Sequence, residues 1–358
     1  MILLDSCLRR NDKKDQKSNC DTVSKGSVHL RNKFYCVFSL HVIPDMVMFH
    51  SLRSKICLGF ELARWRYFPV GILPVILGAA IAWHEDSALI IWKLVLTVIG
   101  IFFAHLGANA ANDCFDYLSG VDQFAYDNAP ELKGSGVCGS DILTSGKLTI
   151  REGFAVVGVF FLIAFVIAIV LTITSGWLVF ILAIAGFVLG LFYCAPPIAF
   201  GYIGYGLGEL AILLTFGPLP VIGSYYIQTG HLSWNPVIAS LPIGLYTVAI
   251  VFNQHFAHAE ADKAGGKLTP VVVLGEKRMR RVSTLMLILI YVSIVIAVCF
   301  GIMPIYALIT LTLAPIIIAS SVRIGRTPAS TAASLLFLFK IVKFNILTGI
   351  LIILAFIV

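Results

Sequence analysis

The chain has 358 residues, of which 59% are hydrophobic and 13% charged, and its mean hydropathy is +0.93. About a quarter of the residues of a soluble domain are charged, so the composition excludes an ordinary soluble protein and predicts an all-α polytopic membrane protein. The net charge of +7 would suit a nucleic-acid partner, but its placement along the chain explains it without one. The cysteines are scattered, without the paired spacing of a zinc or redox site.

The first 45 residues differ in kind from the rest, being polar, rich in Lys, Arg, Asp and Asn, and without apolar periodicity. They lack the apolar core of a secretory signal peptide. We expect residues 1–45 to be disordered or to be a spurious translated extension, because Met46 and Met48 offer start positions just before the organised part. Residues 46–358 then form one transmembrane domain.

Apolar runs long enough to cross a bilayer recur through the rest of the chain, since a spanning helix needs about 20 such residues. The pattern predicts about nine transmembrane helices. Their ranges are 68–83, 89–111, 154–173, 177–193, 207–227, 237–252, 282–300, 304–322 and 335–357. Prolines inside several runs are tolerated in a membrane where neighbouring helices satisfy the backbone groups that they leave unpaired.

Lys and Arg are confined to one set of connecting loops, and such loops face the cytoplasm. That set carries Lys133, Lys147, Arg151, Lys263, Lys267, Lys277, Arg278, Arg280, Arg281, Arg323 and Arg326. The opposite loops, around residues 85–86, 175–176, 228–235 and 302–303, carry neither. We therefore expect a multi-pass protein of the bacterial inner membrane, with no obligate protein partner and with two acidic clusters facing the cytoplasm.

The first acidic cluster closes the second predicted helix. Asn109, Asn112, Asp113 and Asp116 are spaced so that they gather on one side of the helix where it reaches the membrane surface. Carboxylates so placed in an apolar chain are costly and usually functional, and carboxylate and amide oxygens suit Mg²⁺. The alternative is a solvated loop start, because Asn and Asp are also common in turns.

The second acidic cluster closes the sixth predicted helix. His258 and Asp262 are four apart and share a helix face, whereas Glu260 points to the side. A histidine here is more often an ordinary interfacial residue than a metal ligand. The acidic side chains can also simply pair with Lys263 and Lys267, and for Glu260 we favour that interpretation.

The two clusters end helices that run in the same direction, so a four-helix unit used twice in parallel brings them together. Two facing oxygen-rich patches can hold two Mg²⁺ ions that bridge carboxylates to a diphosphate, and basic side chains add phosphate contacts. The basic candidates are Arg64, Arg66, Lys147, Arg151, Lys267 and Arg278. Because the patches lie over apolar helices, the sequence favours a lipid diphosphate whose head leaves as pyrophosphate.

Several separated motifs resemble those of the UbiA superfamily of membrane prenyltransferases. They are Asn112-Asp113-x-x-Asp116 with Gly120-x-Asp122, the acidic motif before Lys263-Ala-Gly-Gly-Lys267, and segments at 64–69, 74–78, 193–197, 206–209 and 216–230. The resemblance covers about residues 64–275. Within the superfamily, the Gly-x-Asp ending and the Gly-Pro-Leu-Pro segment are similar to the 1,4-dihydroxy-2-naphthoate polyprenyltransferases of menaquinone synthesis.

The resemblance implies a nine-helix bundle that transfers a polyprenyl group from polyprenyl diphosphate to a ring carbon of an aromatic acceptor. The implied cofactor is Mg²⁺, and a naphthoate acceptor would also lose CO₂. By position, Asn112, Asp113 and Asp116 would bind one Mg²⁺ and Asp262 the other, with the three carboxylates as the catalytic groups.

The same resemblance implies roles for four further side chains. Arg64, Arg66 and Lys267 would contact the diphosphate, and Tyr193 would line the pocket near the reacting carbon. A carboxylate, Asp116 or Asp122, would help to activate the acceptor hydroxyl.

Two positions depart from the family pattern. His258 stands where the family's second Asp-x-x-x-Asp motif begins, and imidazole suits transition metals better than Mg²⁺. The histidine would change which metal the site prefers, or Glu260 would support the metal site, or the acceptor would differ from that of the family. Ile198 and Ala199 follow the proline pair where relatives often carry Lys or Arg, so one phosphate contact is missing or moved.

Other functions compete with this interpretation. A secondary transporter also places charges among helices, but usually near the membrane midplane, whereas both clusters here lie at helix ends. Among enzymes, the acceptor could instead be 4-hydroxybenzoate, a chlorin or haem ring, or a glycerol-phosphate lipid. His258 also fits a member that binds prenyl lipids without turnover, which Mg²⁺-dependent release of pyrophosphate would exclude.

Overall fold

The computed structural model describes residues 54–133, 141–326 and 330–358, and every regular element among them is helical. The segment expected to be disordered or spurious, 1–45, lies outside these residues. The long helices are α3 (Phe68–Asp86), α4 (Ile91–Ser119), α7 (Ile150–Ser175), α8 (Leu178–Leu191), α10 (Leu207–Phe216), α11 (Pro218–Thr229), α12 (Asn235–Ala264), α14 (Glu276–Cys299), α15 (Ala314–Ile324) and α16 (Thr331–Ile357). The short ones are η1 (Trp65–Tyr67), α5 (Val121–Asn128), η2 (Pro130–Leu132), α6 (Asp141–Thr144), α9 (Phe200–Ile203), α13 (Pro270–Leu274) and η3 (Ile305–Leu313).

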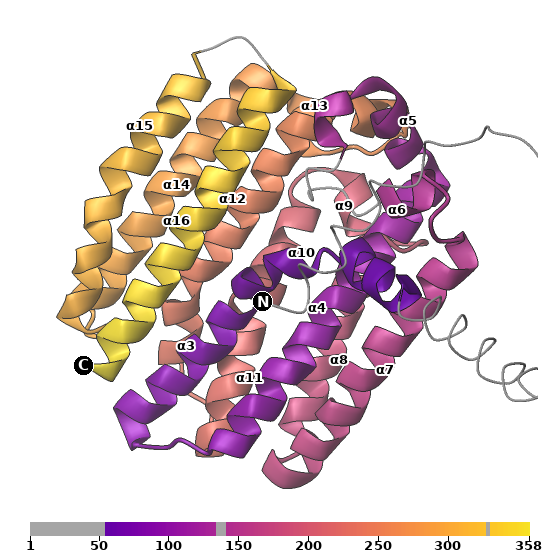
Figure 1. The fold of residues 1–358 in the computed structure, drawn as a ribbon. Coiled ribbons are helices and arrows are strands. Elements are labelled where there is room, and N and C mark those ends of the chain that lie inside the picture. Colours follow the sequence, from indigo (N-terminus) through magenta and orange to yellow (C-terminus); the bar gives the residue numbers. More distant parts are fainter. Residues whose placement is uncertain (1–53, 134–140, 327–329) are drawn as a thin grey trace, which may run out of the picture. The chain divides into compact units, whose positions relative to one another are not determined.

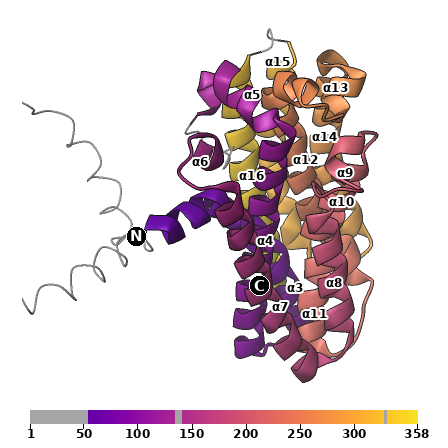
Figure 2. The same cartoon turned by 90° about the vertical axis from the view of Figure 1, so that its right-hand side faces the viewer.

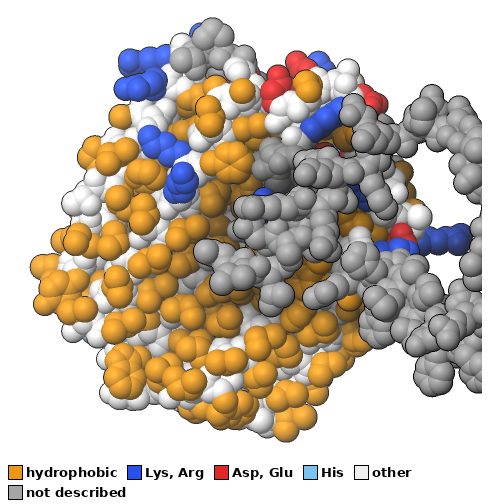
Figure 3. Space-filling view, viewed as in Figure 1, with side chains coloured by type: hydrophobic (Ala, Val, Ile, Leu, Met, Phe, Trp, Pro, Cys, Tyr) orange, Lys and Arg blue, Asp and Glu red, His pale blue; other side chains and the backbone are white. Residues whose placement is uncertain are grey.

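Within the described residues, eight helical stretches are long and apolar enough to cross a membrane. They are α3 with η1, α4, α7, α10 with α11, α12, α14, η3 with α15, and α16. The remaining predicted span, 177–193, corresponds to the shorter apolar helix α8. Figure 3 shows hydrophobic side chains over most of the face in view, with charged ones toward the upper end. The predicted all-α membrane fold is confirmed.

Local sequence explains where several of these helices begin and end. Thr149 and Glu152 form a capping box that satisfies backbone donors at the start of α7. Gly120 has φ of 82°, a conformation that glycine adopts without strain, and there the chain turns from α4 directly into α5. Gly217 separates α10 from α11, and Pro218 then occupies the first position of α11.

Two large apolar clusters hold the described helices together. The larger joins α3, α11, α12, α14 and α16, and the smaller joins α4 and α7 to residues around Cys194. Helices α3 and α11 approach so closely that a Cβ on Gly78 would lie 2.3 Å from the carbonyl oxygen of Val221. Only glycine fits this contact without displacing α11.

Four of the short helices, α5, α6, α9 and α13, lie toward one end of the bundle, as Figures 1 and 2 both show. We call it the motif end, because α4 and α12 finish there with the two predicted acidic clusters. At the far end, the Tyr225 hydroxyl donates to Glu85 over 2.9 Å, and His231 lies 3.0 Å from Asp86. These contacts join the end of α3 to α11 and the loop that follows it.

Candidate active site

A cavity of about 680 Å³ opens between α4, α7 and α8 on one side and α10, α11 and α12 on the other. Its charged and ionisable lining side chains at the motif end are Arg64, Asp116, Asp122, His255, His258, Asp262 and Lys267. Toward the far end the wall becomes apolar, and Leu171, Val179 and Ile227 pack together there. A charged mouth above an apolar chamber suits a ligand with an ionic head and a hydrocarbon tail.

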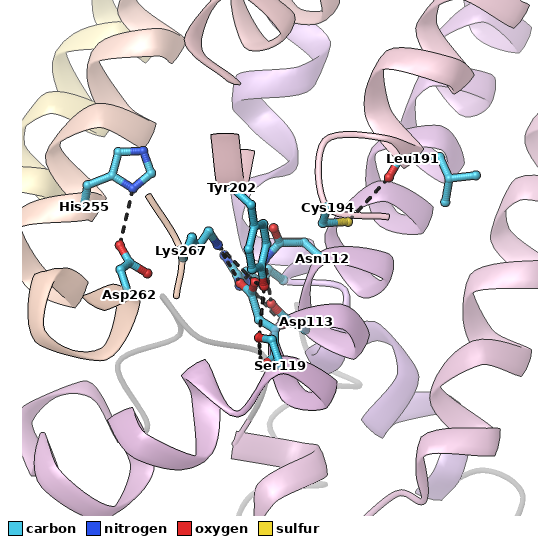
Figure 4. A network of polar contacts seen from close by, with 11 residues as sticks. Asn112, Asp113, Ser119, Leu191, Cys194, Tyr202, His255, Asp262 and Lys267 are labelled. Carbon is cyan, nitrogen blue, oxygen red and sulfur yellow. Dashed lines mark hydrogen bonds and ion pairs between the residues drawn. The ribbon is translucent and has the colours of Figure 1, made fainter. Parts of the chain in front are cut away.

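Asp116 is the centre of a polar network. Its partners Asn112, Tyr202 and Lys267 are labelled in Figure 4. The buried Lys267 ammonium donates to both of its carboxylate oxygens, each over 3.0 Å. The Tyr202 hydroxyl donates to Oδ1 over 2.5 Å, and the Asn112 side-chain amide donates to Oδ2 over 2.9 Å. Three side chains, from α4, α9 and the loop after α12, therefore donate four hydrogen bonds to one carboxylate.

Asp113 has a different partner from Asp116. The Arg64 guanidinium forms an ion pair with this fully buried carboxylate. Arg64 stands immediately before η1 with φ of 53°, a left-handed conformation that is uncommon for a residue with a side chain. Such positions occur where the surrounding structure holds the backbone, often at functional sites. Each acidic residue of the first cluster is thus neutralised by a cation from another segment.

Helix α12 brings His255, His258 and Asp262 to the opposite wall. The His255 ring lies between two carboxylates, with Nε2 3.4 Å from Glu209 and Nδ1 3.8 Å from Asp262. Glu209 comes from the first turn of α10. Figure 4 shows Lys267 reaching the α4 side chains, while Asp262 faces His255 on the α12 side. Asp116 and Asp262 line the same cavity, so both predicted clusters share one site.

Charges at the motif end shift the pKa values of groups in its loops and short helices. Burial alone would lower the pKa of Lys267, but Asp116 and Asp262 raise it well above its ordinary value, so Lys267 is a permanent cation. Burial, reinforced by Asp116 and then Asp113, raises the pKa of Asp122 well above its ordinary range. Burial also raises the pKa of Tyr202, whose hydroxyl therefore remains a donor.

The structure brings most of the predicted site residues together. Asn112, Asp116, His258, Asp262, Arg64, Lys267 and Tyr193 all line the cavity. Asp113 is buried against Arg64 and is not a lining residue. Arg66 is placed differently from the predicted diphosphate contact, because its exposed side chain lies 3.5 Å from Glu61 outside the cavity. Glu260 is exposed as well, in line with its expected sideways direction.

Three participants were not predicted from the sequence as site residues: Tyr202, Glu209 and His255. Tyr202 stands in a one-turn helix after the Pro196-Pro197 pair, and its approach to Asp116 depends on how that loop folds back. Glu209 and His255 are ionisable residues in or beside apolar runs. Such residues are usually functional in a membrane protein, so this pattern could have indicated them as site residues. The contact between α10 and α12, which brings these two side chains together, could not be predicted from the sequence.

A protein-family model matches most of the chain, including the helices that form this site. Residues 71–347 match the model of the UbiA prenyltransferase family. The chain belongs to the UbiA prenyltransferase family. A 2-carboxy-1,4-naphthoquinone phytyltransferase of Synechocystis is 31% identical to this UbiA enzyme over 239 residues, which is 64% of this chain and 70% of that protein. A UbiA prenyltransferase domain-containing protein 1 of Gallus gallus is 28% identical over 236 residues, 66% of this chain and 67% of its own length.

Solved structures of UbiA homologues share the fold. The structure of one from Archaeoglobus fulgidus bound to DMAPP and Mg²⁺ has a TM-score of 0.57 and 16% sequence identity, covering 83% of this chain and 99% of that one. A digeranylgeranylglyceryl phosphate synthase also has a TM-score of 0.57, with 17% identity over 85% of this chain and 99% of that one. With its family match over residues 71–347, the chain is a membrane prenyltransferase of the UbiA family.

The donor chemistry of this UbiA site fits Mg²⁺. Asn112, Asp116, Asp122 and Asp262 offer oxygens on one cavity, and hard oxygen donors are what Mg²⁺ prefers. Asp122 Oδ2 is buried without a hydrogen-bond partner in the described part of the chain. Among those same residues, no three acidic, His or Cys side chains are already close enough to hold an ion. Lys267 and Arg64 neutralise the first cluster in the arrangement seen here.

Proposed function

We propose that this enzyme transfers a polyprenyl group from polyprenyl diphosphate to an aromatic ring carbon, with 1,4-dihydroxy-2-naphthoate as the acceptor. The observation that carries the proposal is the convergence of Asp116, Asp262 and Lys267 at the mouth of a cavity whose depth is apolar. The naphthoquinone substrate named for the Synechocystis relative supports the choice of acceptor.

The arrangement suits ionisation of an allylic diphosphate. The bond between C1 of the prenyl chain and the diphosphate oxygen breaks, and its electron pair leaves with pyrophosphate. Lys267 and Arg64 are the cavity cations that can move from carboxylates to the developing charge on the leaving group. Mg²⁺, held by Asn112, Asp116 and Asp262, would supply further positive charge to the diphosphate.

The second half of the reaction joins the acceptor to the allylic carbon. An electron-rich ring carbon forms the new C–C bond, and the ring regains aromaticity by losing CO₂ from a carboxylated position or a proton from an unsubstituted one. Tyr193 and the apolar wall shield the allylic cation from water. Asp122 lines the same cavity and can accept a proton from the acceptor hydroxyl.

We also propose that the motif end faces the cytoplasm of a bacterial inner membrane. The support is the confinement of loop Lys and Arg residues to that side in the sequence. Cysteine labelling of loops at each end in intact cells tests it. Labelling of the motif-end loops by an impermeant reagent would contradict it.

The activity is tested with purified protein in lipid nanodiscs. The protein is incubated with a polyprenyl diphosphate, Mg²⁺ and either 1,4-dihydroxy-2-naphthoate or 4-hydroxybenzoate, and the lipid extract is analysed by mass spectrometry. We expect a prenylated, decarboxylated naphthalene product that disappears with EDTA. Asp262→Asn should lower the rate at least about a hundredfold, by loss of a preorganised charge, whereas the exposed Glu260→Gln should not. Prenylation of hydroxybenzoate alone would overturn the choice of acceptor.

His258 gives a separate test of the metal. It lines the cavity one helical turn before Asp262, and a carboxylate is a better Mg²⁺ ligand than imidazole. We expect His258→Asp to keep or raise Mg²⁺-dependent activity, measured as pyrophosphate release over a Mg²⁺ titration. A folded but inactive His258→Asp protein would show that the imidazole has a role of its own.

A further inference from the structure

A stripe of polar side chains on α4 continues deeper into the membrane than the acidic cluster. His105, Asn109, Asn112 and Asp116 are spaced four, three and four residues apart, so they lie along one helix face, and all four line the cavity. At about 1.5 Å per residue, His105 lies about 16 Å below Asp116 along the helix axis. It is one turn beyond Asn109, whose side chain already donates to the carbonyl of Ala63 over 3.2 Å.

The position of the His105 ring is set by packing. A Cβ on Gly71 of α3 would lie 2.5 Å from His105 Nδ1, so only glycine leaves room for the imidazole there. The ring of Phe216 meets it edge to face, with centroids 5.2 Å apart. Nδ1 is buried and has no hydrogen-bond partner among the described residues. A polar ring held this way in an apolar wall is costly to the fold.

A second polar side chain lies at a similar depth on the opposite wall. Gln254 on α12 is eight residues before Asp262, about 12 Å along the axis, and it lines the cavity. Its amide makes no hydrogen bond within the described part of the chain. The hydroxyls farther along the cavity differ, because Thr97, Thr215 and Thr247 each donate to a carbonyl of their own helix.

The cavity therefore has three levels. An ionic level contains Asp116, Asp262 and Lys267, a neutral polar level contains His105 and Gln254, and an apolar floor follows. The diphosphate belongs to the first level because the cations are there, and a polyprenyl tail has no group for the second. Of the two substrates, only the acceptor has oxygen atoms that can reach beyond the reacting carbon.

We propose that His105, with Gln254 opposite, binds a ring hydroxyl of the aromatic acceptor and so determines which acceptor is accepted. The inference rests on the proposed function, of which it specifies the acceptor subsite. Either imidazole nitrogen donates or accepts according to the tautomer, and the Gln254 amide offers both roles. The acceptor then lies between α4 and α12, with its hydroxylated edge toward the floor and its reacting carbon toward the diphosphate.

The first experiment measures binding without turnover. The affinity of the purified protein for 1,4-dihydroxy-2-naphthoate is determined anaerobically in EDTA. We expect His105→Leu to weaken binding about tenfold to a hundredfold, the usual effect of leaving a buried hydrogen-bonding group unpaired. His105→Gln should recover most of that loss. Gly71→Ala, which keeps the imidazole but takes its space, should weaken binding as His105→Leu does.

The matched control is Asn345→Leu. Asn345 is also a fully buried polar side chain of a membrane helix without a hydrogen-bond partner in the described residues, but it does not line the cavity. We expect it to leave acceptor affinity unchanged. Thermal unfolding of each variant verifies that it is folded.

The second experiment compares 1-hydroxy-2-naphthoate and 4-hydroxy-2-naphthoate, each of which lacks one hydroxyl. For the analogue that lacks the bound hydroxyl, His105→Leu should no longer weaken binding. For the analogue that keeps this hydroxyl, His105→Leu should weaken binding as it does for the dihydroxynaphthoate. In turnover, the KM for the acceptor should rise while that for the prenyl diphosphate stays constant. Equal affinities of wild type and His105→Leu, or a penalty that survives with both analogues, would overturn the proposal. Failure of the proposed function is separate: wild-type protein would then bind the naphthoate in EDTA but prenylate none of the acceptors.

Discussion

Replacing Lys267 with glutamine tests whether the buried pair with Asp116 holds the site together. The change removes a cation that donates to both carboxylate oxygens over 3.0 Å and leaves the carboxylate buried. Breaking a buried ion pair by removing one partner usually destabilises by about 3–5 kcal/mol. Tyr202 and Asn112 still donate to Asp116, so we expect the lower end, a loss of about 3 kcal/mol.

The assay is the free energy of unfolding in EDTA for wild type, Lys267→Gln, Asp116→Asn and the double variant. Because Asp116→Asn removes the unpaired charge, the double variant should recover about 2 kcal/mol relative to the sum of the single changes. Lys263→Gln is the matched control, since this exposed lysine of the same segment should change stability by no more than about 0.5 kcal/mol. A Lys267→Gln protein as stable as wild type, or strictly additive variants, would refute the reasoning.

Three further changes have defined outcomes. Gly78→Ala should lower the unfolding free energy by about 1–3 kcal/mol and with it the melting temperature, because the new Cβ meets the Val221 carbonyl oxygen at 2.3 Å. Tyr202→Phe removes a hydrogen bond to a carboxylate, so chemical unfolding should show a loss of about 1.5–3 kcal/mol. Asp122→Asn should become more stable relative to wild type as pH rises. Because the pKa of Asp122 is raised in the folded protein, the stability that its neutral form gives to wild type is fully present below the ordinary carboxyl pKa and is lost as pH rises through the raised value. The asparagine has no such pH dependence, and melting curves across pH in EDTA would show the difference.

Each of these has a control or a contrary result. Gly186→Ala adds a methyl group into open space on α8 and should not destabilise. Equal losses for Gly78→Ala and Gly186→Ala would point to helix propensity rather than to the α3–α11 contact. In an Asp116→Asn background, Tyr202→Phe should lower the unfolding free energy by less than it does in wild type. An equal loss in both backgrounds would mean that the Tyr202 hydroxyl stabilises the protein through another partner. A pH-independent difference between Asp122→Asn and wild type would contradict the shifted pKa.

The membrane-spanning helices could be predicted from hydrophobic runs alone, because a bilayer requires long apolar helices and allows few alternatives. Breaks inside such apolar runs could not be predicted from hydropathy. The run at 207–227 is two helices, α10 and α11, which meet at Gly217 and Pro218. The run at 304–322 begins as the 3-10 helix η3 before α15 continues it. Hydropathy does not register a change in backbone hydrogen bonding.

Helix direction explains why the acidic clusters could be placed at one end. Asp116 and Asp262 end helices that cross in the same sense, so topology alone puts them together. Side-chain direction at a helix start is harder to predict. Arg64 and Arg66 are two residues apart, yet the left-handed backbone at Arg64 accompanies a contact with Asp113 while Arg66 lies on the surface beside Glu61. That distinction depends on one φ angle, which composition and spacing do not encode.

The ion pairs of Arg64 and Lys267 with the first acidic cluster also bear on how the protein matures in a cell. A structural zinc domain stays unfolded until its ion arrives, whereas here the chain supplies its own positive charges to the carboxylates. We therefore expect the protein to fold in the membrane without magnesium and to bind the ion only when its substrate arrives.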